Sequence, residues 1–212
     1  MNEKFFDLKK EKQDRMINAA LKVFALNGYR HASTDDIVRE AAISKGLLFH
    51  YFENKLGVYA FVYDYSVRYL LLELSTAVDA KETDLFTLMQ QVETGKMHAM
   101  CGYPYLQPFL NRAQAENVNE ALVAVEERKQ QMEEAYENIY ARADLGKYAA
   151  AEDVMKLRKM MELTIKGLMN ERILEDAFQP EMLYEEITEY LNLSRRLAER
   201  STQPSDEAFS EK

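Results

Sequence analysis

The sequence of 212 residues has few of the residues that interrupt helices: seven glycines and four prolines. So few turn-forming residues favour long helices over a β-rich chain. The single cysteine excludes an intramolecular disulfide, and it excludes the zinc patterns that need several cysteines. The sequence therefore predicts an all-α protein.

Long apolar runs are also missing. The most apolar stretch, residues 61–74, is interrupted by Asp64, Arg68 and Glu73, whereas a membrane-spanning helix needs about 20 consecutive apolar residues. The N-terminus has no long apolar segment and no cleavage site of small residues, so we expect no signal peptide. We expect a cytoplasmic protein that does not bind membranes.

Negative charge predominates, with a formal net charge of −9, but it is unevenly distributed. Residues 1–55 hold 10 basic and 8 acidic residues and carry +2, so the remainder carries −11. Salt screens charges beyond about 8–10 Å, so a mildly basic N-terminal region can bind phosphates despite an acidic body. The charge permits a nucleic-acid partner without predicting one.

Three helices are predicted in the N-terminal quarter of the chain. Apolar residues recur at helical spacing over residues 9–27, and Gly28 suits the position that follows a helix C-terminus. Ser33 or Thr34 can cap a second helix, and Ser44 can cap a third after a tight turn. The pattern predicts a helix-turn-helix, which presents its second helix to the major groove of DNA.

The last of these helices, residues 45–52, has an unusual outer face. Leu48 and Phe52 lie four residues apart and point together into the core, which leaves large aromatic side chains outside. Lys45 can donate to guanine or phosphate, and Gly46 lets the backbone approach the DNA closely. The residues expected to contact DNA are Thr34, Ser44, Lys45, Gly46, Leu47, Phe49, His50, Tyr51 and Lys55.

Residues 17–55 resemble the DNA-binding head of the TetR (tetracycline-repressor) family of one-component bacterial regulators. The features that carry the resemblance are Ala19-Ala20, Phe24, Gly28, Ser33-Thr34, Asp36-Ile37, Ala41, Ile43, Ser44-Lys45-Gly46, Leu48, Tyr51-Phe52 and Lys55.

The resemblance implies two kinds of DNA contact and a body that holds an effector. The groove would be faced by Lys45, Gly46, Leu47, Phe49 and His50, and the DNA backbone would be held by Thr34, Tyr51 and Lys55.

Six further helices are predicted after the head, which makes about nine in all. We expect a DNA-binding domain at residues 1–55, a helical effector-binding and dimerisation domain at 56–200, and a disordered tail at 201–212. A long helix at 56–80 would connect head and body. The remaining predicted helices cover residues 85–100, 105–115, 121–143, 152–176 and 180–200.

Methionine and tyrosine are concentrated in the middle of the chain. Most such residues are ordinary core, but together they suit an adaptable pocket for a largely apolar small-molecule effector. The residues expected to line it are Tyr63, Met89, Val92, Met97, Met100, Tyr103, Tyr105, Phe109, Met132, Tyr136 and Met160.

The last two predicted helices are the expected homodimer interface, as an intermolecular four-helix bundle. The alternative is that both helices only complete the core of one chain. The residues assigned to the interface are Val154, Leu157, Met161, Ile165, Leu168, Leu183, Ile187, Tyr190, Leu191 and Leu197.

Metal and catalytic chemistry have weak support. His98 and Cys101 could share a helix face, but two ligands make a poor metal site, and we expect a buried, inert cysteine. None of the three histidines follows a glutamate by three residues, so the di-iron carboxylate pattern is missing. We expect no cofactor, no metal and no enzyme activity.

The function predicted from the sequence is that of a ligand-responsive repressor that binds a palindromic operator in double-stranded DNA as a homodimer. Activation in place of repression stays open. The rival hypotheses are a helical scaffold or partner-binding protein that does not bind DNA, and an all-α enzyme.

Overall fold

The computed structural model describes residues 3–146, 148, 150–174 and 178–200. Within them the protein is all-α, as predicted, with nine α-helices and one short 3-10 helix. The expected tail at 201–212 lies outside the described residues. The head contains η1 (Glu3–Asp7), α1 (Lys10–His31), α2 (Thr34–Glu40) and α3 (Lys45–Phe52). The body contains α4 (Lys55–Ala77), α5 (Leu85–Gly102), α6 (Leu106–Gln114), α7 (Asn119–Tyr140), α8 (Ala151–Arg172) and α9 (Pro180–Arg200).

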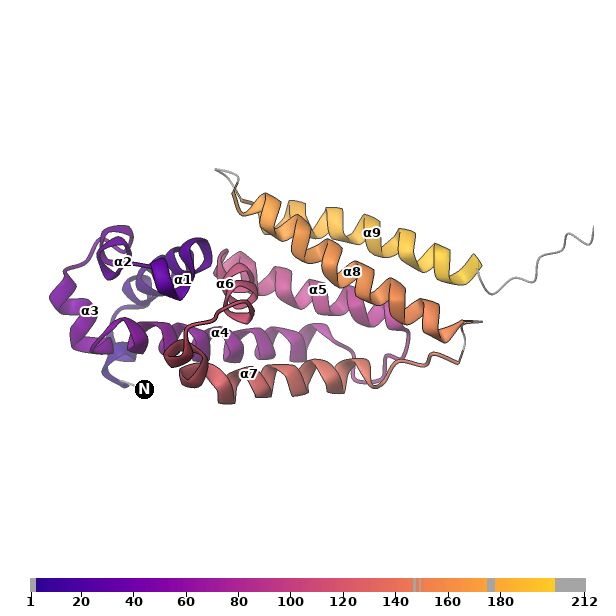
Figure 1. Ribbon diagram of the computed structural model, residues 1–212, viewed down its shortest axis with the longest axis horizontal. Helices are drawn as coiled ribbons and strands as arrows, with labels where there is room; N and C mark the ends of the chain where they lie inside the picture. Colours follow the sequence, from indigo (N-terminus) through magenta and orange to yellow (C-terminus); the bar gives the residue numbers. More distant parts are fainter. Residues whose placement is uncertain (1–2, 147, 149, 175–177, 201–212) are drawn as a thin grey trace, which may run out of the picture.

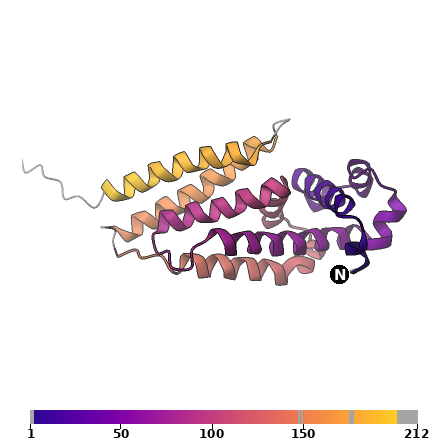
Figure 2. The ribbon, with the colours of Figure 1, turned by 180° about the vertical axis from the view of Figure 1, so that it is seen from behind.

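The helices of the body form layers, with the head at one end. From one side to the other the order is α7, α4, α5 and then the pair α8 and α9, in both views (Figures 1 and 2). The pair α8–α9 therefore lies on the side of the bundle away from α7. None of the described helices combines the length and the apolar character that crossing a membrane requires.

The first helix is interrupted where the sequence predicts its end. Gly28 has φ 66° and ψ 174°, a backbone conformation that L-residues rarely adopt. The chain continues beyond it for one more helical turn, to His31. The side chain of Tyr29 in that turn is buried, so the turn packs into the interior of the molecule.

The core of the head continues into the body. Phe24 of α1 packs edge-on against Tyr59 of α4, with ring centroids 5.0 Å apart, and its centroid lies 6.0 Å from that of Phe109 of α6. All three side chains are fully buried. One buried cluster therefore crosses residue 55 and joins α1 to α4 and α6. The division into domains at residue 55 stays a prediction.

A second buried cluster joins α5 to α8 and α9, and it corrects the predicted dimer interface. A side chain that is buried within one chain has no surface left for a partner. The buried residues of that assignment are Val154, Met161, Ile165, Leu183, Ile187 and Leu191. Helical periodicity identified an apolar stripe correctly, but it could not tell whether α5 or a second copy covers that stripe.

Candidate nucleic-acid interface

Three side-chain caps fix the helix-turn-helix. Ser33 Oγ accepts a hydrogen bond from the backbone N–H of Asp35 at 3.1 Å, and Ser44 Oγ accepts one from Leu47 at 3.2 Å. Asn54 Oδ1 accepts from the backbone N–H of Gly57 at 2.8 Å at the start of α4. The caps predicted at Ser33 and Ser44 are therefore confirmed, and the N-terminus of each helix has a defined direction.

The outer face of α3 is partly exposed. Leu48 and Phe52 are buried, whereas the N-terminal residues of the helix, Lys45 and Gly46, are open to solvent. His50 is also exposed, and Leu47, Phe49 and Tyr51 are half-buried. The Tyr51 ring packs edge-on against buried Phe5, with centroids 5.7 Å apart. Tyr51 therefore lies on the flank of α3 and is fixed by the core.

Lys45 connects α3 to α2. Its Nζ lies 2.8 Å from Asp35 Oδ1 and 6.0 Å from the centre of the Phe49 ring. Both members of the ion pair are largely exposed. Such pairs contribute only about 0–1 kcal/mol, so a phosphate or a base can replace Asp35 at little cost.

Lys55 is already engaged within the head. Its Nζ donates to the carbonyl oxygens of Tyr29 at 2.9 Å and of Ala32 at 3.4 Å, and lies 4.4 Å from the centre of the Tyr29 ring. The ammonium group thus holds the last turn of α1 against the start of α4. A phosphate contact by Lys55 stays a prediction, as does one by half-buried Thr34 at the start of α2.

The last turn of α1 is also joined to the connection before α7 and to the first turn of α7, through contacts that sequence reasoning missed. The backbone N–H of Tyr29 donates to Glu116 Oε2 at 2.9 Å, and Tyr29 Oη donates to Glu120 Oε1 at 2.6 Å. Burial favours protonation of Glu116, but backbone N–H groups of Asn117, Tyr29 and Val118 outweigh it and lower its pKa. These residues are 87 to 91 positions apart in the sequence, so no local pattern predicts the contacts.

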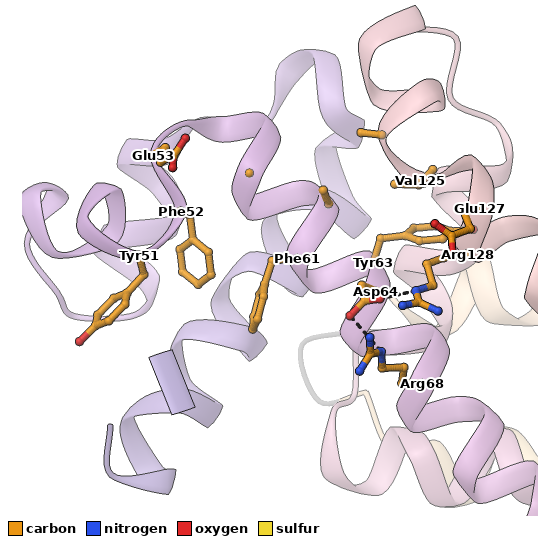
Figure 3. A pocket seen from close by; sticks show the side chains of 13 residues that line it. Tyr51, Phe52, Glu53, Phe61, Tyr63, Asp64, Arg68, Val125, Glu127 and Arg128 are labelled. Atoms are coloured by element: carbon orange, nitrogen blue, oxygen red, sulfur yellow. Dashed lines mark hydrogen bonds and ion pairs between the residues drawn. The ribbon is translucent and has the colours of Figure 1, made fainter. Parts of the chain in front are cut away.

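A groove of about 730 Å³ separates the start of α4 from α7 (Figure 3). Asp64 of α4 forms an ion pair with Arg128 of α7 and lies 3.2 Å from Arg68 Nε. Tyr51 and Phe52 lie at the head end of the groove. The carboxylate of Asp64 therefore joins α4 to α7.

The expected effector residues do not share one site. Seven of them are buried: Tyr63, Met89, Val92, Met100, Tyr103, Phe109 and Met132. Met89 and Tyr136 do line one cavity, of about 220 Å³, where charged and amide side chains accompany them. Met160 is 61% exposed on α8, so its assignment to an enclosed pocket is wrong.

Cys101 is exposed, which corrects the prediction of a buried cysteine. Its Sγ lies 3.3 Å from Glu181 Oε1. Partial burial and that carboxylate raise the pKa of the thiol. His98 lies 3.9 Å from Glu73. Among the residues that the structure describes, no three metal-ligating side chains are grouped.

The segment that forms this interface matches a known family. Residues 16–60, which run from α1 into α4, match the family described as bacterial regulatory proteins of the tetR family. This part of the chain therefore resembles the DNA-binding region of the TetR family.

Two curated relatives agree with that likeness. An uncharacterized HTH-type transcriptional regulator, YuxN of Bacillus subtilis, is 36% identical over 78 residues, which are 35% of this chain. Another, TtgW of Pseudomonas putida, is 41% identical over 49 residues, which are 23% of this chain. The matched regions span 26% and 37% of these relatives. Both are described as regulators and neither as an enzyme.

Solved structures extend the likeness of the fold to the body. A TetR family regulator from Chloroflexus aurantiacus J-10-FL has a TM-score of 0.55 and 23% identity, with 93% of each chain covered. The fatty acid degradation regulator FadR from Bacillus halodurans has a TM-score of 0.54 and 19% identity, with 84% of this chain and 96% of its own covered. At these identities the likeness concerns the fold alone.

Proposed function

We propose that this protein is a transcriptional repressor of the TetR family that binds a palindromic operator as a homodimer and releases it when a small molecule binds the body. The observation that carries DNA binding is the exposed N-terminal face of α3. Lys45 and Gly46 stand there next to a capped helix N-terminus. A protein that acts on chromosomal DNA in a bacterium works in the cytoplasm.

Positioning and sequence reading would fall to different side chains. The helix N-termini at Thr34 and Ser44 carry backbone N–H groups and hydroxyls that suit phosphate oxygens. Leu47 and Phe49 offer apolar contact to thymine methyl groups, and Lys45 offers donors to guanine. The phosphate contacts would fix the register of α3 on the DNA, and the base contacts would select the sequence.

A second copy of the chain would supply the second head. Exposed residues recur at i, i+3 and i+7 on each of the last two helices, mostly apolar: Met160, Leu163 and Gly167 on α8, and Tyr190, Leu193 and Leu197 on α9. We assign the dimer contact to these stripes in place of the six buried residues. A two-fold dimer would place its α3 helices about 34–36 Å apart on successive turns of DNA.

Release of the operator would follow from a shift of α4 or α6. Phe109 of α6 and Tyr59 of α4 both pack on Phe24 of α1, so either helix can displace the head. An effector that prefers the DNA-incompetent arrangement by a few kcal/mol would suffice to shift the population.

A gel shift with DNA from beside the gene tests the proposal. We expect binding by the wild-type protein that weakens with salt, and a loss of at least about 10-fold in affinity when Lys45→Ala is combined with Tyr51→Phe. Phenylalanine at position 51 keeps the ring that packs on Phe5 and removes only the hydroxyl. Lys129→Ala on the surface of α7 is the control and should bind as the wild type does. Unchanged affinity of the double variant would reject α3 as the reading helix, and an absence of salt-sensitive binding would favour a scaffold protein.

A further inference from the structure

A cavity of about 220 Å³ with both apolar and polar lining residues lies between α5, α6, α7 and α8. One side of it is apolar and is formed by Met89, Ile165 and Met169. Pockets for drug-sized molecules typically measure about 300–1,000 Å³, so this cavity suits a smaller compound.

Two polar atoms of residues that line this cavity are buried without a hydrogen-bond partner among the described residues. They are the hydroxyl oxygen of Tyr136 and Oε1 of Gln107. Gln107 Nε2 donates to Asn111 Oδ1 at 2.9 Å, which fixes the amide so that Oε1 remains an acceptor. Buried polar groups are nearly always hydrogen-bonded. Two such atoms without partners on the lining of one cavity point to a ligand that supplies the missing hydrogen bonds.

Two ion pairs line the same cavity. Glu93 is buried, and its Oε1 lies 2.7 Å from Lys96 Nζ. Burial alone would lower the pKa of Lys96, but Glu93 outweighs it and raises that pKa, so the ammonium stays charged. Burial raises the pKa of Tyr136, whose hydroxyl therefore keeps its proton and can donate or accept. On the opposite side Arg158 pairs with Glu162 at 3.1 Å.

The positive charge in the lining exceeds the negative charge by one. Lys96 and Arg158 each have a carboxylate partner within the cavity, whereas Lys166 at the rim donates to the neutral Oε1 of Gln114 at 3.1 Å. An anionic group on a ligand would complement the excess cation.

We propose that this cavity binds a small carboxylate that also carries a hydroxyl group, the hydroxyl donating to Gln107 and the carboxylate lying toward the cationic rim. Binding of this ligand is independent of the proposed function, and only its role as the effector rests on that function. An unsubstituted alkyl chain does not fit, since it would leave Gln107 and Tyr136 unpaired beside a buried ion pair. This ligand class differs from the largely apolar effector that the sequence suggested.

The amides of this cavity belong to the helix that packs on the head. Gln107, Asn111 and Gln114 follow one side of α6, and Phe109 on another side packs against Phe24 of α1. Arg112, also on α6, lies close to Gly28, where an added Cβ would be 3.1 Å from its Nε. A ligand that bonds to Gln107 thus acts on the helix that contacts the end of α1.

Calorimetry on the full-length protein tests the ligand class with three probes: 4-hydroxybenzoate, benzoate and hexanoate. We expect 4-hydroxybenzoate to bind at least about 10-fold more tightly than benzoate and hexanoate, since one neutral hydrogen bond to an otherwise unpaired acceptor is of that order. Gln107→Met should remove the preference for 4-hydroxybenzoate. Gln91→Met, on α5 and outside the cavity lining, should keep that preference. Equal affinities, no binding at millimolar concentration, or a preference that survives Gln107→Met would each overturn the proposal.

The melting temperature of the ligand-free protein supplies a second test. Tyr136→Phe removes an unpaired buried hydroxyl and should raise the melting temperature by about 2–4 °C. The matched variant Tyr148→Phe removes a hydroxyl that donates to Asp84 Oδ2 at 3.2 Å and should lower it. A lower melting temperature for Tyr136→Phe would show that its hydroxyl is structural, and it would overturn the proposal.

A gel shift on the same samples separates this proposal from the proposed function. Failure of the ligand-free protein to bind operator DNA would refute the function and leave the calorimetric result intact. If DNA is bound and 4-hydroxybenzoate binds without releasing it, the cavity is a ligand site but its effector role is refuted. Release of DNA by 4-hydroxybenzoate that is lost in Gln107→Met supports both.

Discussion

Two residues other than glycine have positive φ, among those described, and both lie in the helix-turn-helix region. Ala42, with φ 51°, forms the turn between α2 and α3, and Glu53, with φ 64°, ends α3. The left-handed region costs an L-residue about 1 kcal/mol or more relative to glycine. Ala42 is exposed, so its methyl group contributes little that offsets this cost.

We therefore predict that Ala42→Gly stabilises the protein by about 0.5–1 kcal/mol, measured by urea denaturation. The neighbouring variant Ala41→Gly is the control. Ala41 is buried with φ −75°, so its replacement should destabilise by about 1 kcal/mol or more. Destabilisation by Ala42→Gly would mean that the greater conformational entropy of glycine in the unfolded chain outweighs the relief of backbone strain at position 42.

Gly46 and Gly57 form a pair for which opposite results are expected. A Cβ at Gly46 meets nothing within 4 Å, whereas a Cβ at Gly57 would lie 2.0 Å from the carbonyl oxygen of Phe52. Gly46→Ala should therefore keep or raise stability, by up to about 1 kcal/mol. Gly57→Ala should lower it by about 1–3 kcal/mol.

The DNA affinity of Gly46→Ala tests the close approach of α3 to the duplex. If the backbone at Gly46 touches a phosphate or a base, the added methyl group should weaken binding by about 10-fold while the melting temperature does not fall. Unchanged affinity of a stable Gly46→Ala protein would place Gly46 away from the DNA.

The sequence predicted those residues of the interface whose structure is set locally. The caps at Ser33 and Ser44 and the burial of Leu48 and Phe52 follow from spacing within a few residues. The engagement of Lys55 by the carbonyl of Tyr29 could not be predicted, because it depends on how α1 ends against α4.

At the scale of elements, the contact between the last turn of α1 and the connection from α6 to α7 depends on pH. Glu116 accepts hydrogen bonds from the backbone N–H groups of Tyr29, Asn117 and Val118, which hold its pKa below the usual value of a glutamate. A carboxylate with a lowered pKa contributes stability above its unfolded-state pKa, and that stability is lost as the pH falls through the folded-state value.

We predict that Glu116→Gln destabilises the protein by about 0.5–1 kcal/mol at pH 7, a figure reduced for partial exposure. The difference from the wild type should shrink at low pH, as the pH falls through the folded-state pKa of Glu116 and the wild-type carboxyl becomes neutral too. Denaturant titrations at both pH values check this. Glu134→Gln, exposed on α7, is the control, and a pH-independent difference for Glu116→Gln would assign the effect to packing.

The elements themselves were predictable, and their partners were not. The helices expected at 45–52 and 56–80 correspond to α3 and α4, since capping and periodicity are local properties. The polar side of α6 escaped notice because Gln107, Asn111 and Gln114 look like a solvated face in the sequence. Only the position of α6 between α5, α7 and α8 places them at a cavity.

At the scale of the whole molecule, the two features that the proposed dimer needs lie on different parts of the chain. The reading helix is at one end, and the exposed apolar stripes of α8 and α9 run along the body (Figure 1). The formal charge is +2 in residues 1–55 and −11 in the rest of the chain, so an acidic body would favour contact with DNA through the heads alone.

The last prediction concerns the dimer and combines Leu163→Glu on α8 with Leu193→Glu on α9. Both side chains are exposed, at 58% and 46%, so the single chain should fold and keep its helical content. In a two-fold interface the new carboxylates would be buried without partners, at a cost of several kcal/mol. Light scattering should give the mass of one chain, and DNA affinity should fall by about 100-fold or more, since a single head makes few contacts.

The control is Val123→Glu on α7, which is 69% exposed on the opposite side of the bundle and should remain dimeric. A double variant that stays dimeric and binds DNA normally would move the interface away from these stripes.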